Sequence, residues 1–276
     1  MQLGATGGFA LGSILPPAMF LGGETAVATI ASPIIDAQTR ERRFYRRMAI
    51  FLVVIVLLGF GPSFYLRGIV PEYPRPNPTL PAGVIAHGLF FTLWMAAFVA
   101  QTQLVSAGRR DVHMKLGAAT VVLAVLLVPV MYLTAVWGVA RESHPPFVDS
   151  LNWTAIPLAV IPAFAYLVYE AWRRRGEAQW HKRLMLGATI LVVFGPGFSR
   201  IPLAPPSFWG FTIQLFAGLA LLYAPLFIWD RRTTGKVHPA TWTGFGVGAL
   251  PAAVPLVLIA DGAWAPVARH LPGVGG

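Results

Sequence analysis

The chain has 276 residues, of which 56% are hydrophobic and 12% charged, and its mean hydropathy is +0.64. This composition lies well outside the range of soluble domains and indicates a membrane protein. The sequence contains no cysteine, which excludes disulfides, thiolate zinc sites and cysteine-ligated iron–sulfur clusters. Any metal or haem must therefore use histidine, methionine or oxygen ligands.

We expect residues 1–39 to form a poorly ordered apolar extension. Residues 1–35 are rich in glycine and proline, which disfavour a helix, and they lack the basic n-region of a secretory signal. An upstream start codon, or an additional interfacial or membrane-inserted segment, are the alternatives. The folded unit is expected to begin at residue 40, where RERRFYRRMAIF places arginines and two aromatic residues at the lipid headgroups.

Seven apolar runs follow in chain order, each bounded by charge, proline or both. A helix needs roughly 20 apolar residues to cross a hydrocarbon core of ~30 Å. The runs are residues 48–66, 83–105, 116–138, 153–172, 184–199, 208–229 and 240–260. The sequence therefore predicts an all-α, polytopic transmembrane helix bundle of about seven spans over residues 40–262, with an outer C-terminal tail over 263–276.

Membrane topology explains the net charge of +10 better than nucleic-acid binding does. If the first span starts inside, the inner segments hold sixteen of the 21 basic residues. The outer segments hold the others, which are Arg67, Arg75, Arg141, Arg200 and Arg269. This alternation obeys the positive-inside rule at every loop. We expect a bacterial inner-membrane protein with a cytoplasmic N-terminus, a periplasmic C-terminus and the lipid bilayer, not nucleic acid, as its partner.

A polar stripe runs along the second expected span, AHGLFFTLWMAAFVAQTQ. Counting by sevens gives His87, Trp94 and Gln101, which the helical period places on one slowly drifting face. Such a face is costly in lipid and is expected to look into the bundle as a ligand-binding wall. Arg200 is a nearby candidate for binding a carboxylate, a propionate or a quinone carbonyl. The alternatives are one interhelical hydrogen bond for His87 and a plain interface anchor for Arg200.

Two histidines occupy equivalent places in a weak internal repeat. RRDVHMKLGAAT and QWHKRLMLGAT each place a histidine two residues before a Lys or Arg, at the start of an apolar run. His113 and His181 are then expected to lie level on the inner side and to clasp the iron of a b-type haem. Lys115 and Arg183 are expected to face its propionates. The alternative is that both histidines mark helix starts at the water interface.

Other cofactor classes lack their groups. A retinal Schiff base needs a lysine within the last span, and residues 240–260 contain none. The chain also has neither a G-x-x-x-x-G-K-[ST] loop nor an H-E-x-x-H pair. No catalytic residue can be assigned from the sequence.

Three long strings resemble a widespread group of uncharacterised bacterial multi-pass membrane proteins. They are RRFYRRMAIF with GFGPSFYLRG, AHGLFFTLWMAAFVAQTQLVSAGRRDVHMKLG, and WHKRLMLGATI ending in SR, and the resemblance covers residues 40 to about 235. A membrane histidine followed by an inner histidine is also similar to the transmembrane ascorbate-linked dihaem cytochromes b. Those proteins carry two pairs of histidines at two depths. Here His87 has no outer partner unless His144 folds back, so the resemblance leaves a second haem in doubt.

These features predict an integral inner-membrane protein that binds b-type haem and transfers electrons across or within the membrane. Quinone or another membrane complex would be its partner. The alternative is a non-redox polytopic protein that acts as a small-molecule carrier or sensor, or as an accessory subunit of a membrane complex.

Overall fold

The computed structural model describes residues 22–71 and 79–274, and within them the side chains from residue 36 onwards. In these ranges the chain is helical and has no strand beyond one isolated bridge between Arg67 and Val70. The prediction of an all-α helix bundle is therefore confirmed. Residues 1–21, which belong to the expected extension, lie outside the described residues.

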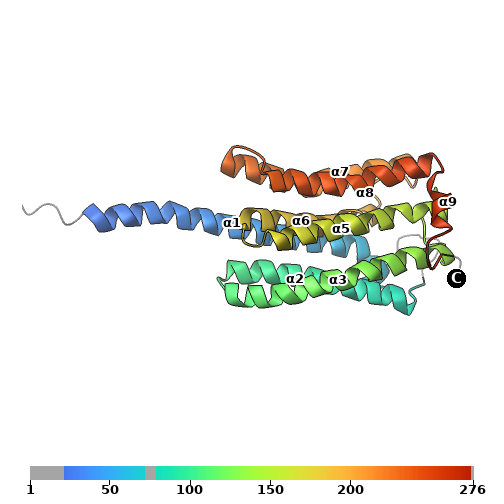
Figure 1. Cartoon of the computed structure of the whole chain (residues 1–276), viewed down its shortest axis with the longest axis horizontal. Helices are drawn as coiled ribbons and strands as arrows, with labels where there is room; N and C mark the ends of the chain where they lie inside the picture. The colour runs from blue at the N-terminus through green and yellow to red at the C-terminus, as the bar shows by residue number, and fades with distance from the viewer. Residues whose placement is uncertain (1–21, 72–78, 275–276) are drawn as a thin grey trace, which may run out of the picture. The chain divides into compact units, whose positions relative to one another are not determined.

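The helices follow one another along the chain as Figure 1 shows. They are α1 (Gly22–Phe60), the π-helical turn η1 (Gly61–Tyr65), α2 (Ala82–Ser106), α3 (Arg110–Ala140), α4 (Ser150–Trp153), α5 (Ala155–Arg173), α6 (Ala178–Phe194), the 3₁₀ turn η2 (Phe198–Arg200), α7 (Phe208–Thr234), α8 (Pro239–Ala260) and α9 (Trp264–Ala268).

The chain divides into two compact units, Met1–Arg43 and Phe44–Gly276. The described part of the first unit is helical from Gly22 onwards, whereas the sequence led us to expect a helix only after residue 39. Alanine, the strongest helix former, occurs four times between residues 22 and 39 and offsets the two glycines at the start. The second unit is the helix bundle.

Among the described residues, six helical segments are long and apolar enough to cross a membrane. They are Asp36–Tyr65, Ala82–Ser106, Arg110–Ala140, Ser150–Arg173, Phe208–Thr234 and Pro239–Ala260. The expected fifth span, 184–199, is not among them, because α6 has 17 residues and ends at Phe194. Pro196 follows two residues after the last helical residue and has no backbone N–H to continue the helical hydrogen bonding. Over the residues that the structure describes, the expected seven spans are therefore corrected to six.

Helix α6 lies in the interior of the bundle. All residues from Leu186 to Phe194 are buried, and α5, α7 and α8 pack against the helix. A helix that is apolar on every side is expected in such a place. The surrounding helices instead expose large apolar side chains, such as Leu93, Val125 and Ile213, as contact with lipid requires.

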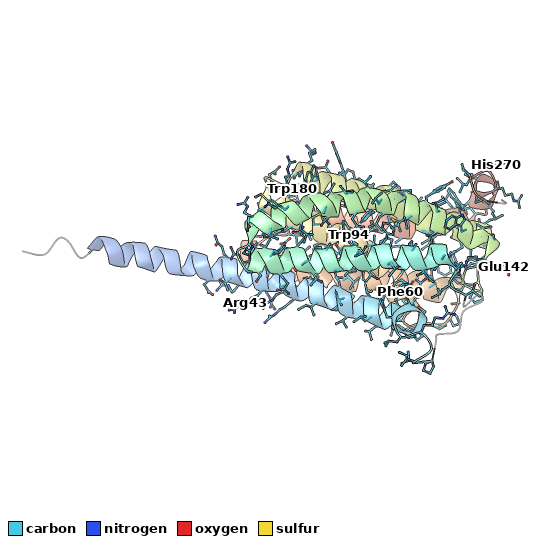
Figure 2. All side chains as sticks on the ribbon, turned by 90° about the horizontal axis from the view of Figure 1, so that it is seen from below. Arg43, Phe60, Trp94, Glu142, Trp180 and His270 are labelled. Atoms are coloured by element: carbon cyan, nitrogen blue, oxygen red, sulfur yellow. The ribbon has the colours of Figure 1, made fainter. Side chains whose placement is uncertain are left out.

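One end of the bundle, called the basic end below, collects the α2–α3, α5–α6 and α7–α8 turns. The start of α3 meets the start of α6 there, because the rings of His113 and His181 are neighbours. The start of α6 meets the end of α7 through an ion pair between Arg183 and Asp230. Trp180 marks this end in Figure 2.

The opposite end, called the proline-rich end below, carries the α3–α4 and α6–α7 loops and the C-terminal segment. The indole N–H of Trp264 donates to the Thr154 hydroxyl (2.9 Å), and the Tyr132 hydroxyl donates to the carbonyl of Pro272 (2.9 Å). These bonds hold residues 264–272 across the end of the bundle, where Figure 1 shows α9.

Candidate functional site

His113 and His181 each lie in the first turn of a helix at the basic end. Helix α2 ends at Ser106, and Gly108 turns the chain with a φ of +74°, a conformation that glycine adopts without a steric penalty. The backbone N–H of His113 then donates to the carbonyl of Arg109 (3.0 Å). The N–H of His181 donates in the same way to the carbonyl of Glu177 (2.9 Å).

The structure brings these two imidazoles together. Their ring centres are 6.4 Å apart, and the ring planes are nearly perpendicular, at 84°. Each ring comes from a different helix, α3 or α6. The basic end therefore holds one pair of neighbouring imidazoles.

The Nδ1 atom of each ring is engaged by a neighbouring helix. Nδ1 of His181 lies 2.8 Å from the carbonyl of Ala171 on α5, which only a protonated Nδ1 can use. The amide of Gln101 on α2 lies against Nδ1 of His113; when the amide nitrogen donates there, its oxygen accepts from the N–H of Gly117.

The four cations near His113 and His181 in the sequence differ in whether their side chains face solvent or the interior of the bundle. Lys115 and Arg110 are exposed on α3. Lys182 lies over the ring of Tyr45, with Nζ 5.3 Å from the ring centre. Arg183 points into the bundle instead, and its side chain is only 1% exposed. The sequence led us to expect Arg183 beside a haem propionate, but the structure buries its guanidinium against Asp230 instead.

Arg183 belongs to a buried polar network that joins α6, α7 and α8. Its Nη2 donates to Oδ1 of Asp230 (2.6 Å), its Nε donates to the same oxygen (3.1 Å), and its Nη1 donates to the carbonyl of Gln179 (3.0 Å). Oδ2 of Asp230 accepts from the hydroxyl of Thr241 (2.6 Å) and from the backbone N–H of His238 (3.0 Å). Both charged groups thus have hydrogen-bond partners inside the bundle.

Asp230 was not among the residues expected to be functional, because it stands directly before Arg231 and Arg232, where charges at the end of a span are ordinarily exposed. One signal was present. Asp230 is the only acidic residue between positions 208 and 260. A lone acid between two apolar helices requires a partner cation when it is buried, because an unpaired charge there is very costly.

The polar stripe of α2 looks into the bundle. Trp94, labelled in Figure 2, is 1% exposed and packs edge to face on Phe164 of α5, with ring centres 5.1 Å apart. Within the described part of the chain, neither Nε1 of Trp94 nor Nδ1 of His87 has a hydrogen-bond partner, although both atoms are buried. Gln101 lies seven residues after Trp94, about two helical turns further along α2, and its amide contacts Nδ1 of His113.

His87 lies near the proline-rich end among apolar groups and one cation. Its ring packs on Phe91, with centres 4.8 Å apart, and faces the backbone of Val130 on α3. Arg200 interacts with it electrostatically, and the Arg200 guanidinium lies 4.5 Å above the ring of Phe60. His87 and Arg200 thus lie at the same end of the bundle, far along α2 from the histidine pair.

Among the described residues, no three His, Cys, Asp or Glu side chains gather to hold a metal ion. His144 lies in the loop after α3, with Nδ1 3.0 Å from the carbonyl of Pro145.

A scan against protein-family models, a search of curated proteins and a search of solved structures each found no match. The function therefore has to follow from the side chains and their geometry.

Proposed function

We propose that this integral membrane protein binds one b-type haem between His113 and His181 and passes electrons within or across the membrane. The observation that carries the proposal is the pair of imidazoles, whose ring centres lie 6.4 Å apart. A haem with two histidine ligands supplies a one-electron carrier whose iron has no vacant position.

The spacing of the two rings suits a shared iron. A metal–imidazole bond is about 2 Å long, and a ring centre lies about 1 Å behind its nitrogen, so two imidazoles that share one ion have centres about 6 Å apart. The distance between His113 and His181 agrees with this value.

The contacts at Nδ1 also suit a ligand role. A metal-bound histidine nearly always donates its other N–H to a carbonyl or a similar acceptor, which fixes the tautomer and the ring orientation. His181 has this arrangement through Ala171. His113 acquires it when Gln101 turns its amide oxygen towards Nδ1, because an amide offers both a donor and an acceptor. Lys115 and Arg110 are then the candidates for binding the propionates, in place of Arg183.

We further propose that the basic end faces the cytoplasm of a bacterial cell, with the N-terminus on the same side and the C-terminus in the periplasm. The excess of arginine and lysine at the α2–α3, α5–α6 and α7–α8 turns supports this orientation in an inner membrane. The haem would then lie near the cytoplasmic rim.

An absorption spectrum of the detergent-purified protein tests the haem proposal. Protein from haem-replete cells should show a Soret band and, after reduction with dithionite, the sharp visible bands of six-coordinate haem. His113→Ala and His181→Ala should each abolish the six-coordinate spectrum. His270→Ala is the matched control, because His270 is exposed at the other end of the bundle (Figure 2). A wild-type protein without a Soret band would exclude the proposal.

A second candidate function is that of a non-redox carrier or sensor that binds a small molecule along the α2 stripe. The unpaired polar atoms of His87 and Trp94 favour it. It predicts a colourless protein whose stability responds to a ligand. A colourless protein that co-purifies with a membrane complex would instead indicate an accessory subunit.

A further inference from the structure

We propose a binding site for an anionic glycerophospholipid on the surface where α1 and α7 meet at the basic end. Arg47 of α1 and Arg232 of α7 bind the lipid phosphate, and exposed apolar side chains of the same two helices contact the acyl chains. Binding there requires no haem. The inference therefore goes beyond the proposed function, and the two can fail separately.

Helices α1 and α7 contact each other through two aromatic rings at the basic end. The ring of Phe44 stacks on the ring of Trp229, with centres 4.5 Å apart and planes 12° apart. The two helices run in opposite directions, because Phe60 at the end of α1 contacts Arg200 at the proline-rich end, whereas α7 ends at the basic end. Aromatic rings at the ends of membrane spans are typical of the level of the lipid headgroups.

Arg47 and Arg232 lie beside this aromatic contact, on the same side of it. Arg47 follows Phe44 by three residues, and Arg232 follows Trp229 by three residues. Residues three apart are neighbours on a helix surface, so each arginine is next to one of the stacked rings. Because the two helices are antiparallel, the same three-residue step turns both arginines to the same side. Both arginines are exposed there.

The protein supplies no anion to these two arginines among the side chains that the structure describes. Neither guanidinium has an ion pair or a hydrogen bond there. Asp230, the acid closest in sequence to Arg232, is bonded to Arg183 instead. A guanidinium binds a phosphate through two parallel hydrogen bonds, so two guanidinium groups on either side of one helix contact favour a phosphate between them.

The surface below the two arginines suits acyl chains. The exposed apolar side chains on the same faces are Ile50 and Val54 on α1 and Ile228 and Leu221 on α7. They lie three and seven residues after Arg47, and four and eleven residues before Arg232, which are steps that stay on one helix face. A cationic upper part above an apolar lower part matches the order of phosphate and acyl chains in a phospholipid, whereas a soluble anion would use only the upper part.

Thermal unfolding of the full-length protein in detergent, with increasing dioleoylphosphatidylglycerol, tests the proposal. A ligand that binds only the native state raises the unfolding midpoint in a saturable way. We expect saturable stabilisation by this anionic lipid and none by dioleoylphosphatidylcholine at the same total lipid. Arg47→Gln and Arg232→Gln should each bind the anionic lipid about fivefold more weakly, because one arginine near an anionic lipid contributes about 1 kcal/mol.

Two neighbouring arginines provide matched controls. Arg46 and Arg231 follow Phe44 and Trp229 by two residues, so they face the other side of their helices. Arg46→Gln and Arg231→Gln remove the same charge from the same turns and should keep the wild-type affinity. Without added phospholipid, Arg47→Gln and Arg232→Gln should unfold like the wild type, since neither guanidinium has a partner among the described side chains.

Three results would overturn the proposal. Equal weakening in all four glutamine variants would mean that only the general positive charge of the basic end attracts the lipid. Equal stabilisation by dioleoylphosphatidylcholine would mean that the anionic headgroup is not recognised. Equal stabilisation by soluble glycerol phosphate would mean that the site binds a free anion and not a lipid. A haem-free sample serves equally well in every arm.

Discussion

Arg183 and Asp230 illustrate how single residues in this bundle are held by bonds to distant parts of the chain. The two residues are 47 positions apart, and each side chain is at most 1% exposed. Every strong contact of the carboxylate is with a donor from α6 or from the start of α8. Such a pair need not add stability compared with apolar residues of the same size, but removal of one partner leaves a buried charge.

Asp230→Asn should therefore strongly destabilise the protein. Asparagine keeps the shape of the side chain but leaves the Arg183 charge without a counter-charge, which should cost about 3–5 kcal/mol. Chemical or thermal unfolding in detergent measures the loss. The double variant Arg183→Met with Asp230→Asn should lose less than Asp230→Asn alone, because it no longer contains the uncompensated charge.

Asp111→Asn is the matched control for this prediction. Asp111 lies 3.6 Å from Arg109, and both side chains are more than 60% exposed. Screening by water limits such a pair to less than about 1 kcal/mol. Equal losses in Asp230→Asn and Asp111→Asn would mean that the Arg183–Asp230 pair is solvated in the folded protein.

His238 should make the stability of the protein depend on pH. Burial lowers the pKa of His238, as do the charges of Arg183 and Lys182, against the opposing charge of Asp230. Its Nδ1 accepts the N–H of Ala240 (3.1 Å) and caps α8, which a protonated ring cannot do. Because the folded pKa lies below the unfolded value of about 6.5, this contribution is complete above about pH 6.5. It is lost as the pH falls through the folded pKa.

His238→Asn separates this effect from that of the other histidines. Asparagine caps a helix without titrating in this range, so the variant should lose less stability than the wild type between about pH 7 and 5. The other histidines are common to both proteins, and their contributions cancel in the difference. Parallel stability curves for the two proteins would show that His238 does not titrate in a way that is linked to folding.

At the scale of the elements, the sequence predicted where the helices lie along the chain better than it predicted which helix is buried inside the bundle. Apolar runs bounded by charge or proline predicted the places of α2, α3, α5, α7 and α8 because the cost of unpaired backbone in lipid acts locally. The depth of α6 depends on which helices surround it, and that is a long-range property. Its early end at Gly195 and Pro196 could have been read from the sequence.

The crossing of α6 and α8 depends on two glycines and one tyrosine. A Cβ on Gly187 would lie 2.9 Å from the hydroxyl of Tyr223, and a Cβ on Gly244 would lie 2.8 Å from it. Gly187→Ala should therefore cost about 1–3 kcal/mol through overpacking. In a Tyr223→Phe background the cost should be smaller, because the hydroxyl is gone, and a double-mutant cycle of unfolding free energies measures this coupling.

Gly246→Ala on α8 is the control for this crossing. No atom lies within 4 Å of its added Cβ, and the position is exposed, so alanine should be neutral or stabilise the helix by about 0.5–1 kcal/mol. A cost for Gly187→Ala that is unchanged by Tyr223→Phe would assign the strain to the contact with α8 backbone instead.

At the scale of the whole molecule, the sequence predicted only the two residues of the candidate site that belong to the internal repeat. His113 and His181 occupy matching turns, so the repeat predicted that they lie level, and the structure places their rings side by side. The partners of these residues come from elsewhere in the chain. Ala171 contributes only a backbone carbonyl, and Asp230 depends on how α6 and α7 pack, so neither could be assigned without the tertiary structure.

The orientation of the molecule in the membrane gives the last prediction. Gly176 lies at the basic end, Ala263 lies at the proline-rich end, and both are exposed. The chain has no cysteine, so a single thiol introduced at either place is the only one that reacts. With sixteen of the 21 basic residues on the expected inner side, Ala263→Cys should react with an impermeant maleimide in intact cells, and Gly176→Cys only after permeabilisation. The reverse pattern would invert the orientation and place the histidine pair at the periplasmic rim. Reaction of both thiols from one side would contradict the placement of the α5–α6 turn and the end of α8 at opposite ends of the bundle.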